Sequence, residues 1–181
     1  MVILFVPACK KKADTLFTKL PSSATGISFS NTITENDSVN ILNYYYCYNG
    51  GGVGIADFNN DGLQDVFFTG NMVSSKLYLN KGKMKFDDVT GSAGLTTHNW
   101  IMGVSVVDIN NDGWMDIYLN VAGPGGRKGK HHNLLYINQG VKNGTVSFKE
   151  DAAGYGLADS SFCVQSAFLI TTGMVTLTCI C

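Results

Sequence analysis

The sequence lacks an excess of charge of either sign. It contains 13 Lys and Arg residues against 14 Asp and Glu residues, so its formal net charge at pH 7 is −1. A chain this close to neutrality offers no overall field to attract nucleic acid or an anionic membrane, and neither is expected as a partner. Only 15% of the residues are charged while 45% are hydrophobic, which excludes a disordered polar chain.

Long apolar runs and helical periodicity are also missing. No stretch reaches the roughly 18–20 apolar residues of a membrane-spanning helix, and no segment keeps an apolar period of about 3.6 residues. Proline occurs only 3 times, whereas glycine occurs 21 times beside 8 tyrosines and 10 phenylalanines. Abundant glycine with aromatic residues favours short strands joined by tight turns. The sequence therefore predicts an all-β protein with little helix.

Cysteine is too sparse and irregular for a zinc knuckle or a dense disulfide framework, because there are 5 cysteines and no C-x-x-C pair. Residues 1–9 read M-V-I-L-F-V-P-A-C, an apolar run that ends in small residues before Cys9. This run resembles the lipobox of bacterial lipoproteins. The resemblance implies a signal segment at 1–9, lipid attachment at Cys9 and export to the bacterial outer membrane or cell surface, with the lipid as the membrane anchor. The alternative is a buried strand that ends at a free cysteine.

Internal repeats organise the rest of the chain. G-I-A-D-F-N-N-D-G-L-Q-D-V-F-F at 54–68 aligns with S-V-V-D-I-N-N-D-G-W-M-D-I-Y-L at 105–119. Two further elements, L-Y-L-N-x-G and an element of the form F…G-L, follow each copy in the same order. The unit is thus about 50–60 residues long and divides into short strands, as in a propeller blade. The further elements lie at 77–82 and 135–140, at 86–95 and 148–157, and in a looser form at 17–27.

Each copy contains the loop D-x-N-x-D-G-x-x-D, in which oxygen-bearing side chains alternate along a tight turn. Such oxygens can converge on one point, and a hard cation such as Ca²⁺ takes about 6–8 oxygen ligands. Zinc and copper are poor candidates because no Cys or His lies among these residues. The glycines after position 5, Gly62 and Gly113, are expected to adopt positive φ. The predicted ligands, with backbone carbonyls at position 7, are Asp57, Asn59, Asp61, Leu63, Asp65, Asp108, Asn110, Asp112, Trp114 and Asp116.

The sequence of these loops allows two other interpretations. An EF-hand begins in the same way but needs a Glu at position 12 between two helices. Position 12 is Phe68 in one copy and Leu119 in the other, inside apolar strands, so the EF-hand is rejected. The remaining alternative is an Asx-turn hairpin that holds no metal, since Asn, Asp and Gly are favoured in any turn.

The run Y-N-G-G-G-V-G-I-A-D-F-N-N-D-G at 48–62, with L-Y-L-N-x-G and F-x-D-V-T-x-x-A-G-L, resembles the FG-GAP/VCBS repeats of bacterial surface proteins. It is similar in particular to those with an ASPIC/UnbV module, and the resemblance covers about residues 15–168. The resemblance implies a seven-bladed propeller like the integrin α-subunit head, with Ca²⁺ in the blade loops. The chain is therefore expected to be a partial β-propeller, an N-terminal fragment with two complete FG-GAP/VCBS blades and a disrupted third.

The tail at 169–181 breaks this pattern, because it is apolar and carries no charge. One set of codons for this tail, with a single T restored after the first two bases, translates as F-D-Y-D-R-D-G-D-L-D-L-Y-L, a third acidic motif. We therefore expect three segments: a signal segment at 1–9, a repeat region at 10–168 and an out-of-frame tail at 169–181. The alternative for the tail is a genuine apolar strand.

The expected function is binding, through a calcium-binding repeat module of an exported cell-surface protein that mediates adhesion or recognises an extracellular protein or glycan. The alternative is a set of non-catalytic repeats that position substrate for a larger extracellular hydrolase whose catalytic part lies outside this chain. A structural spacer is a third class. No nucleophile–base pair indicates an enzyme within the chain itself.

Overall fold

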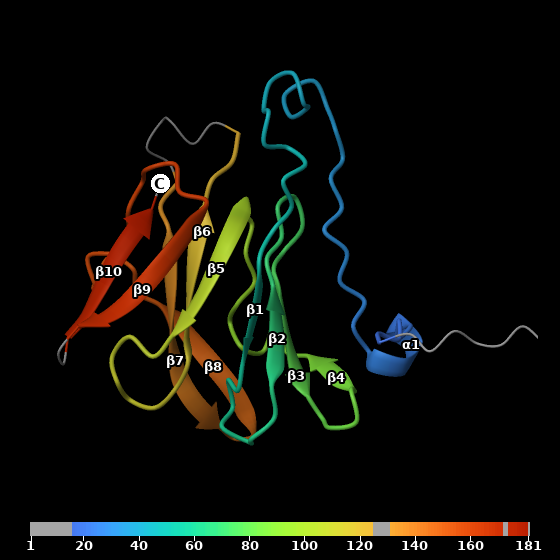
Figure 1. The fold of residues 1–181 in the computed structure, drawn as a ribbon, viewed down its shortest axis with the longest axis vertical. Coiled ribbons are helices and arrows are strands. Elements are labelled where there is room, and N and C mark those ends of the chain that lie inside the picture. The colour runs from blue at the N-terminus through green and yellow to red at the C-terminus, as the bar shows by residue number, and fades with distance from the viewer. Residues whose placement is uncertain (1–15, 125–130, 172–173, 181) are drawn as a thin grey trace, which may run out of the picture.

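The computed structural model describes residues 16–124, 131–171 and 174–180. Two four-stranded antiparallel sheets and one two-stranded hairpin make up the fold of these residues (Figure 1). In both larger sheets, strands adjacent in sequence are adjacent in space. The strands of the first sheet are β1 (Val53–Ala56), β2 (Asp65–Phe68), β3 (Lys76–Asn80) and β4 (Phe86–Asp88). Those of the second are β5 (Ile101–Val107), β6 (Asp116–Val121), β7 (Leu134–Lys142) and β8 (Thr145–Glu150).

The remaining elements are one helical turn, α1 (Ser22–Thr25), and the hairpin of β9 (Gln165–Thr171) and β10 (Met174–Ile180). The prediction of an all-β chain with little helix is confirmed, and the two sheets are compatible with blades of a partial β-propeller. In the first blade, the apolar segments bounded by Gly, Asn or Asp predict strands at 53–56, 65–69 and 76–80, and β1, β2 and β3 match these bounds within one residue.

The main core lies between the two blades. Successive residues of a strand point to opposite faces, so every second apolar side chain of each blade can face the other blade. Phe67 and Leu77 from the first blade, and Ile117 and Leu119 from the second, have no exposed surface there. Burial of each such side chain contributes roughly 1.5–3 kcal/mol, so this interface holds the two blades together.

Glycines allow the first strands of successive blades to lie close together. A Cβ atom on Gly54 of β1 would lie 2.9 Å from Cγ2 of Val106 in β5. A Cβ atom on Gly103 of β5 would collide with the backbone oxygen of Val164, just before β9. Strands β1, β5 and β9 therefore follow one another in space as the inner strands of consecutive blades (Figure 1).

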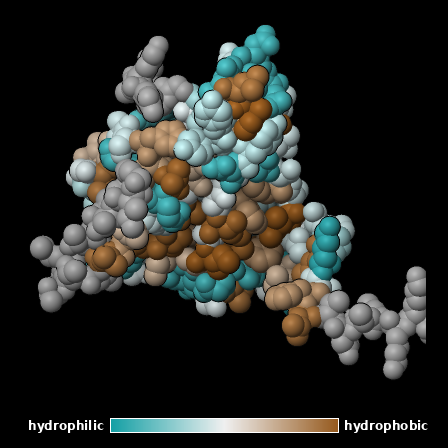
Figure 2. Space-filling model, turned by 45° about the horizontal axis from the view of Figure 1, so that its top comes forward, coloured by the Kyte–Doolittle hydropathy of each residue, from teal (hydrophilic) through white to brown (hydrophobic). Residues whose placement is uncertain are grey.

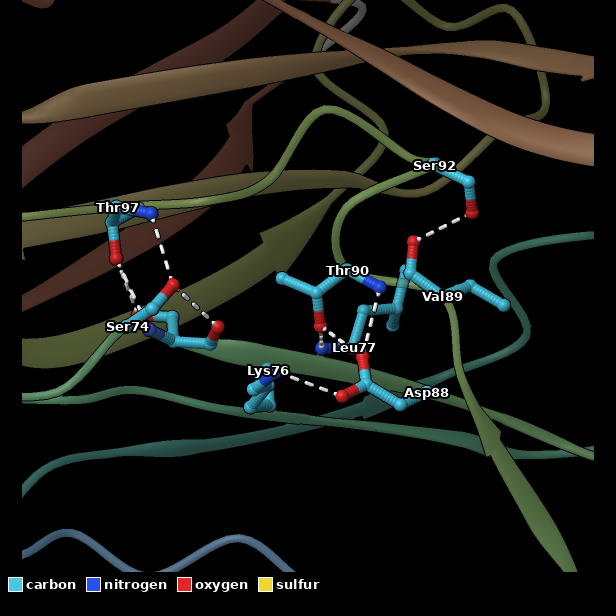
Figure 3. A network of polar contacts seen from close by, with 9 residues as sticks. Ser74, Lys76, Leu77, Asp88, Val89, Thr90, Ser92 and Thr97 are labelled. Atoms are coloured by element: carbon cyan, nitrogen blue, oxygen red, sulfur yellow. Dashed lines mark hydrogen bonds and ion pairs between the residues drawn. The ribbon is translucent and has the colours of Figure 1, made fainter.

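The F-x-D-V-T element closes the outer edge of the first blade through the contacts in Figure 3. Lys76 Nζ lies 2.8 Å from Asp88 Oδ2. The Thr90 hydroxyl donates to Asp88 Oδ1 at 2.6 Å and accepts the backbone N–H of Leu77 at 3.0 Å. Burial acts to raise the pKa of Asp88, but the hydrogen bonds from Lys76 and Thr90 outweigh it and lower that pKa. The motif residues thus tie β4 and the turn after it to β3.

The second blade makes the same closure with different side chains. Ala152 stands where Thr90 stands in the first blade, so no hydroxyl is available. The longer Glu150 side chain accepts the backbone N–H of Ala152 at 3.0 Å and that of Leu135 at 3.4 Å. The repeat therefore preserves the hydrogen bond to the third strand although the residue types change.

The segment before β1 packs along the first blade. After α1, Gly26 adopts φ +81° and lies directly against the backbone oxygen of Phe86 in β4. In the next copy, Gly94 adopts φ +77°. A Cβ atom added to Gly94 would lie 3.3 Å from the backbone oxygen of Phe148 in β8. The looser copy predicted at 17–27 thus makes the same kind of contact as the later element. The chain then runs beside the sheet (Figure 1), where the Phe29 ring stacks on Phe68 at 5.2 Å.

The two blades differ in how well they are covered. The second blade has a further cluster on its other face, where the Tyr118 ring meets Phe168 of β9 at 5.5 Å. The first blade is buried on the face toward the second blade, but its opposite face leaves Val53 and Ile55 at 54% and 61% exposed. Figure 2 shows that apolar side chains reach the surface in the middle of the molecule. The second blade is therefore packed on both sides and the first mainly on one.

The tail residues within the described ranges belong to the end of β9 and to β10, which pair antiparallel with Met174 opposite Thr171. This pairing does not bear on the reading frame of the gene, so the out-of-frame tail stays a prediction. The expected signal segment at 1–9 lies outside the described residues.

Candidate metal centre

The first acidic loop joins β1 to β2 and folds around its own side chains. The Asp61 backbone N–H donates to Asp57 Oδ1 at 3.1 Å and to Asn59 Oδ1 at 3.3 Å, so these two oxygens lie side by side. Asn59 Nδ2 donates to Asp61 Oδ2 at 2.9 Å. The loop reverses direction through Asn60 at φ +55° and Gly62 at φ +85°. The side chains at positions 1, 3 and 5 therefore gather at the mouth of the turn.

The second loop, between β5 and β6, has the same geometry. The Asp112 backbone N–H donates to Asp108 Oδ1 at 3.0 Å and to Asn110 Oδ1 at 3.1 Å. Asn110 Nδ2 donates to Asp112 Oδ2 at 2.8 Å. Asn111 adopts φ +58° and Gly113 adopts φ +85°. The predicted positive φ of both glycines is confirmed, whereas the matching left-handed asparagines were not foreseen.

The position 7 residues, Leu63 and Trp114, were predicted to contribute backbone carbonyls. In the structure, their backbone N–H groups donate to the position 5 carboxylates, Leu63 to Asp61 Oδ1 and Trp114 to Asp112 Oδ1, each at 2.9 Å. These contacts hold the position 5 side chains against the loop, and they do not test whether the carbonyls bind a cation.

The position 9 aspartates are placed differently from the other acids. Asp65 is fully buried, and its two oxygens accept the backbone N–H groups of Phe58 at 2.9 Å and Asn80 at 2.7 Å. Burial raises the pKa of Asp65, these hydrogen bonds act to lower it, and Asp61 and Asp57 raise it further. Asp65 therefore ties the start of its loop to the end of β3.

Asp116 does the same in the second blade. It is fully buried and accepts the backbone N–H groups of Ile109 at 3.0 Å and Asn138 at 2.8 Å. Burial raises the pKa of Asp116, the two backbone hydrogen bonds oppose this, and Asp112 and Asp108 add to the rise. In both loops the structure thus gathers positions 1, 3 and 5 and directs position 9 toward the backbone.

Two asparagines that the sequence analysis did not identify as site residues complete this arrangement. Asn80 Nδ2 donates to the Gln64 carbonyl at 2.9 Å, which fixes the exit of the first loop. Asn138 Nδ2 donates to Met115 O of its own loop at 3.1 Å and to Phe58 O of the first loop at 2.9 Å. The available signal was the asparagine that recurs in L-Y-L-N-x-G.

The chemistry of each loop suits a hard cation at positions 1, 3 and 5, which present two carboxylates and one amide at the surface. Within the described ranges, no three His, Cys, Asp or Glu side chains form a ready-made metal cluster. Since position 9 is held by backbone N–H groups, the remaining oxygen ligands of a cation such as Ca²⁺ would come from main-chain carbonyls and water.

The predicted lipidation site, Cys9, lies outside the described residues, so its lipidation stays a prediction. A search for membrane-spanning elements, restricted to the described residues, finds no helix with the length and apolarity to cross a bilayer.

The fold and the paired loops define a repeat protein built from four-stranded antiparallel blades, each with one acidic hairpin loop. Comparison with known families narrows this class, because residues 57–119 match the FG-GAP-like repeat. The match begins at Asp57 of the first acidic loop and ends at Leu119 in β6, so it includes both loops. It supports an FG-GAP repeat protein. No curated protein matches the chain.

Proposed function

We propose that this chain is a calcium-binding recognition module of an exported cell-surface protein. The supporting observation is that the two acidic loops have the same ligand types, the same left-handed positions and the same hydrogen bonds. A turn that needed only Asx hydrogen bonds would not require carboxylates at both positions 1 and 5 in each copy.

The residues proposed to hold Ca²⁺ are Asp57, Asn59 and Asp61 in one loop and Asp108, Asn110 and Asp112 in the other. The bound ion would supply positive charge that relieves the repulsion between neighbouring carboxylates. Affinity in the range of extracellular modules, about 10⁻⁴–10⁻³ M, is expected. The role is structural, because each loop joins the first two strands of its blade and filling it would stabilise the blade.

The recognition role is adhesion to, or binding of, an extracellular protein or glycan, without catalysis by this chain. It is supported by the FG-GAP-like repeat at residues 57–119. Export as a lipoprotein anchored at Cys9 and membership in the ASPIC/UnbV-associated type belong to the same proposal. They are supported by the lipobox-like sequence and the repeat motifs.

Thermal unfolding of the full chain with and without Ca²⁺ tests this proposal. At a Ca²⁺ concentration ten times the Kd, each site adds about 1.4 kcal/mol, which corresponds to an increase in Tm of about 3–6 °C for a domain of this size. The double variant Asp61→Ala with Asp112→Ala is expected to lose this increase. Asp87→Ala, an exposed acid outside the loops, is the matched control and should keep it. An equal increase in the double variant would refute the ligand assignment.

A further inference from the structure

The two acidic loops are joined at the surface by a hydrogen bond that runs from one blade to the other. Asn60 occupies position 4 of the first loop, between two of its proposed ligands, and its Nδ2 donates to the Gly113 carbonyl of the second loop at 3.2 Å. The next residue, Trp114, donates its backbone N–H to Asp112 at 2.9 Å. The turn of the first loop is thus bonded to the turn that holds a proposed ligand of the second.

A second connection joins the same loops from the buried side. Asn138 of β7 is 1% exposed, and its Nδ2 donates to Phe58 O of the first loop at 2.9 Å and to Met115 O of the second at 3.1 Å. The backbone N–H of Asn138 donates to Asp116 at 2.8 Å, and that of Phe58 donates to Asp65 at 2.9 Å. One continuous chain of hydrogen bonds therefore links the position 9 aspartates of the two loops.

One glycine is bonded to both loops at once. Gly113 accepts from Asn60 through its carbonyl and donates its N–H to Asp108 Oδ2, a proposed ligand of its own loop, at 2.8 Å. In the first loop, the Gly62 N–H makes the equivalent bond to Asp57 Oδ2 at 2.7 Å. A change in either loop on ion binding therefore reaches the other loop across a single residue.

The charges of the loops act in the opposite direction to these bonds. An ion in one loop cancels two negative charges that would otherwise attract an ion to the other loop. Asp61 and Asp112 are exposed, so this effect is screened over about 8 Å at an ionic strength of about 0.15 M and over about 3 Å at 1 M. The hydrogen bonds between the loops are not screened in this way. The interaction at high salt is therefore the one that the bonds transmit.

We propose that the two acidic loops form a coupled pair of cation sites, with Asn60 and Asn138 as positioning residues that do not bind an ion themselves. Filling one loop raises the affinity of the other about fivefold, at the lower end of the coupling between sites in proteins. The coupling rests on the calcium part of the proposed function and describes how that site is regulated, because both loops then fill over a narrow range of Ca²⁺ concentration.

NMR spectra of the full chain during stepwise addition of CaCl₂ test the coupling, with the amides of Gly62 and Gly113 as separate reporters of the two loops. The salt is about 0.5 M KCl, where charges are screened over about 4 Å. Asp61→Ala should raise the Ca²⁺ concentration that half-fills the second loop about twofold, the effect of fivefold coupling between two equal sites. Asp112→Ala should raise that of the first loop by the same factor, because coupling is reciprocal.

A matched pair of asparagine variants tests the surface connection. Asn60→Gly removes the side chain without straining the backbone, because Asn60 already adopts φ +55°. In this background the effect of Asp61→Ala on the second loop should fall below about 1.5-fold, and adding Asn138→Ala should abolish it. Asn111→Gly is the control, since Asn111 has φ +58° at the equivalent position and, among the described residues, makes no bond to the first loop. It should keep the twofold effect.

The outcomes separate the coupling from the calcium assignment, and the spectrum of each variant shows whether it is folded. If the second loop still binds Ca²⁺ in Asp61→Ala with an unchanged half-filling concentration, the coupling is wrong and the calcium sites stand. Equal effects of Asn60→Gly and Asn111→Gly would also overturn the roles of the bridging residues. If neither glycine amide responds to Ca²⁺, the coupling and the calcium assignment are both wrong.

Discussion

At the scale of single residues, the asparagine of L-Y-L-N-x-G is the main connector of each blade, and it lies at the end of β3 (Asn80) and in the middle of β7 (Asn138). Asn138 is 1% exposed, and its side chain joins the second loop to the first through the Met115 and Phe58 carbonyls. Its Oδ1 also accepts the Gly140 N–H at 2.9 Å. Asn80 makes the corresponding contacts at a half-buried position and reaches only its own loop.

Asn138→Ala is therefore expected to cost about 1–3 kcal/mol of unfolding free energy, because the buried Phe58 carbonyl loses this donor. Asn80→Ala, at the equivalent position, should cost less than about 1 kcal/mol, since water can replace the lost bonds. Urea denaturation of both variants measures the difference. Equal costs would show that the bond between the loops does not contribute to stability.

Residue identity predicted part of the site and missed part of it. The positive φ of Gly62 and Gly113 followed from the need for a sharp reversal. The burial of Asp65 and Asp116 could not be predicted from spacing, because it depends on which backbone N–H groups the neighbouring strand presents. The same reason hid Asn80 and Asn138, whose partners become visible only when the strands pair.

At the scale of elements, the fold depends on the close approach of the inner strands. Gly103 in β5 is buried and lies against the backbone oxygen of Val164, and Asn120 Oδ1 would lie 3.1 Å from an added Cβ. The Val164 oxygen belongs to the backbone and can move only if the chain entering β9 shifts, so even one methyl group would push β5 away from β9.

Gly103→Ala is expected to destabilise the protein by about 1–3 kcal/mol through overpacking. Gly91→Ala is the matched control, since a Cβ there meets nothing within 4 Å and its backbone is not left-handed. Thermal unfolding of both variants distinguishes crowding from the loss of a glycine as such. A loss of Tm in Gly91→Ala as large as that in Gly103→Ala would contradict the proposed close packing.

Strand positions in the first blade were predictable because short apolar segments there are separated by turns rich in Gly, Asn and Asp. The repeat also predicted which strands correspond. The packing of the segment before β1 on Phe86 and Phe68 was not predictable, because I-S-F-S at 27–30 alternates as a strand would, yet this segment forms no strand of the described sheets. It is held by single contacts to the first blade instead of by a sheet.

At the scale of the whole molecule, equivalent positions in the two blades have different surroundings. Val104 in the second blade is 8% exposed because the first blade covers it, whereas the equivalent Val53 is 54% exposed. The same residue type in the same repeat position is therefore core in one blade and surface in the other. This contrast allows a direct test of how the blades are stacked.

Val104→Asp is expected to cost about 3 kcal/mol or more, since it buries an unpaired charge between the blades. Val53→Asp should change the unfolding free energy by no more than about 0.5 kcal/mol and reduce concentration-dependent association through the exposed face. Chemical denaturation and sedimentation measure the two effects. A large loss of stability in Val53→Asp would show that this face is covered in solution.

The two acidic loops also contact each other, because Asn60 Nδ2 donates to the Gly113 carbonyl at 3.2 Å. With the Asn138 bond to Phe58, this places both loops in one connected structure. Filling of one loop is therefore expected to stabilise the other, so calcium sites and blade packing would act together.

Isothermal titration of the full chain with Ca²⁺ measures directly whether the two acidic loops bind the ion. Two equivalents are expected to bind per chain, one equivalent after either Asp61→Ala or Asp112→Ala, and none after both changes, with weak affinity of about 10⁻⁴–10⁻³ M. No binding by the folded chain up to about 10 mM Ca²⁺, or the same stoichiometry in all variants, would contradict this expectation.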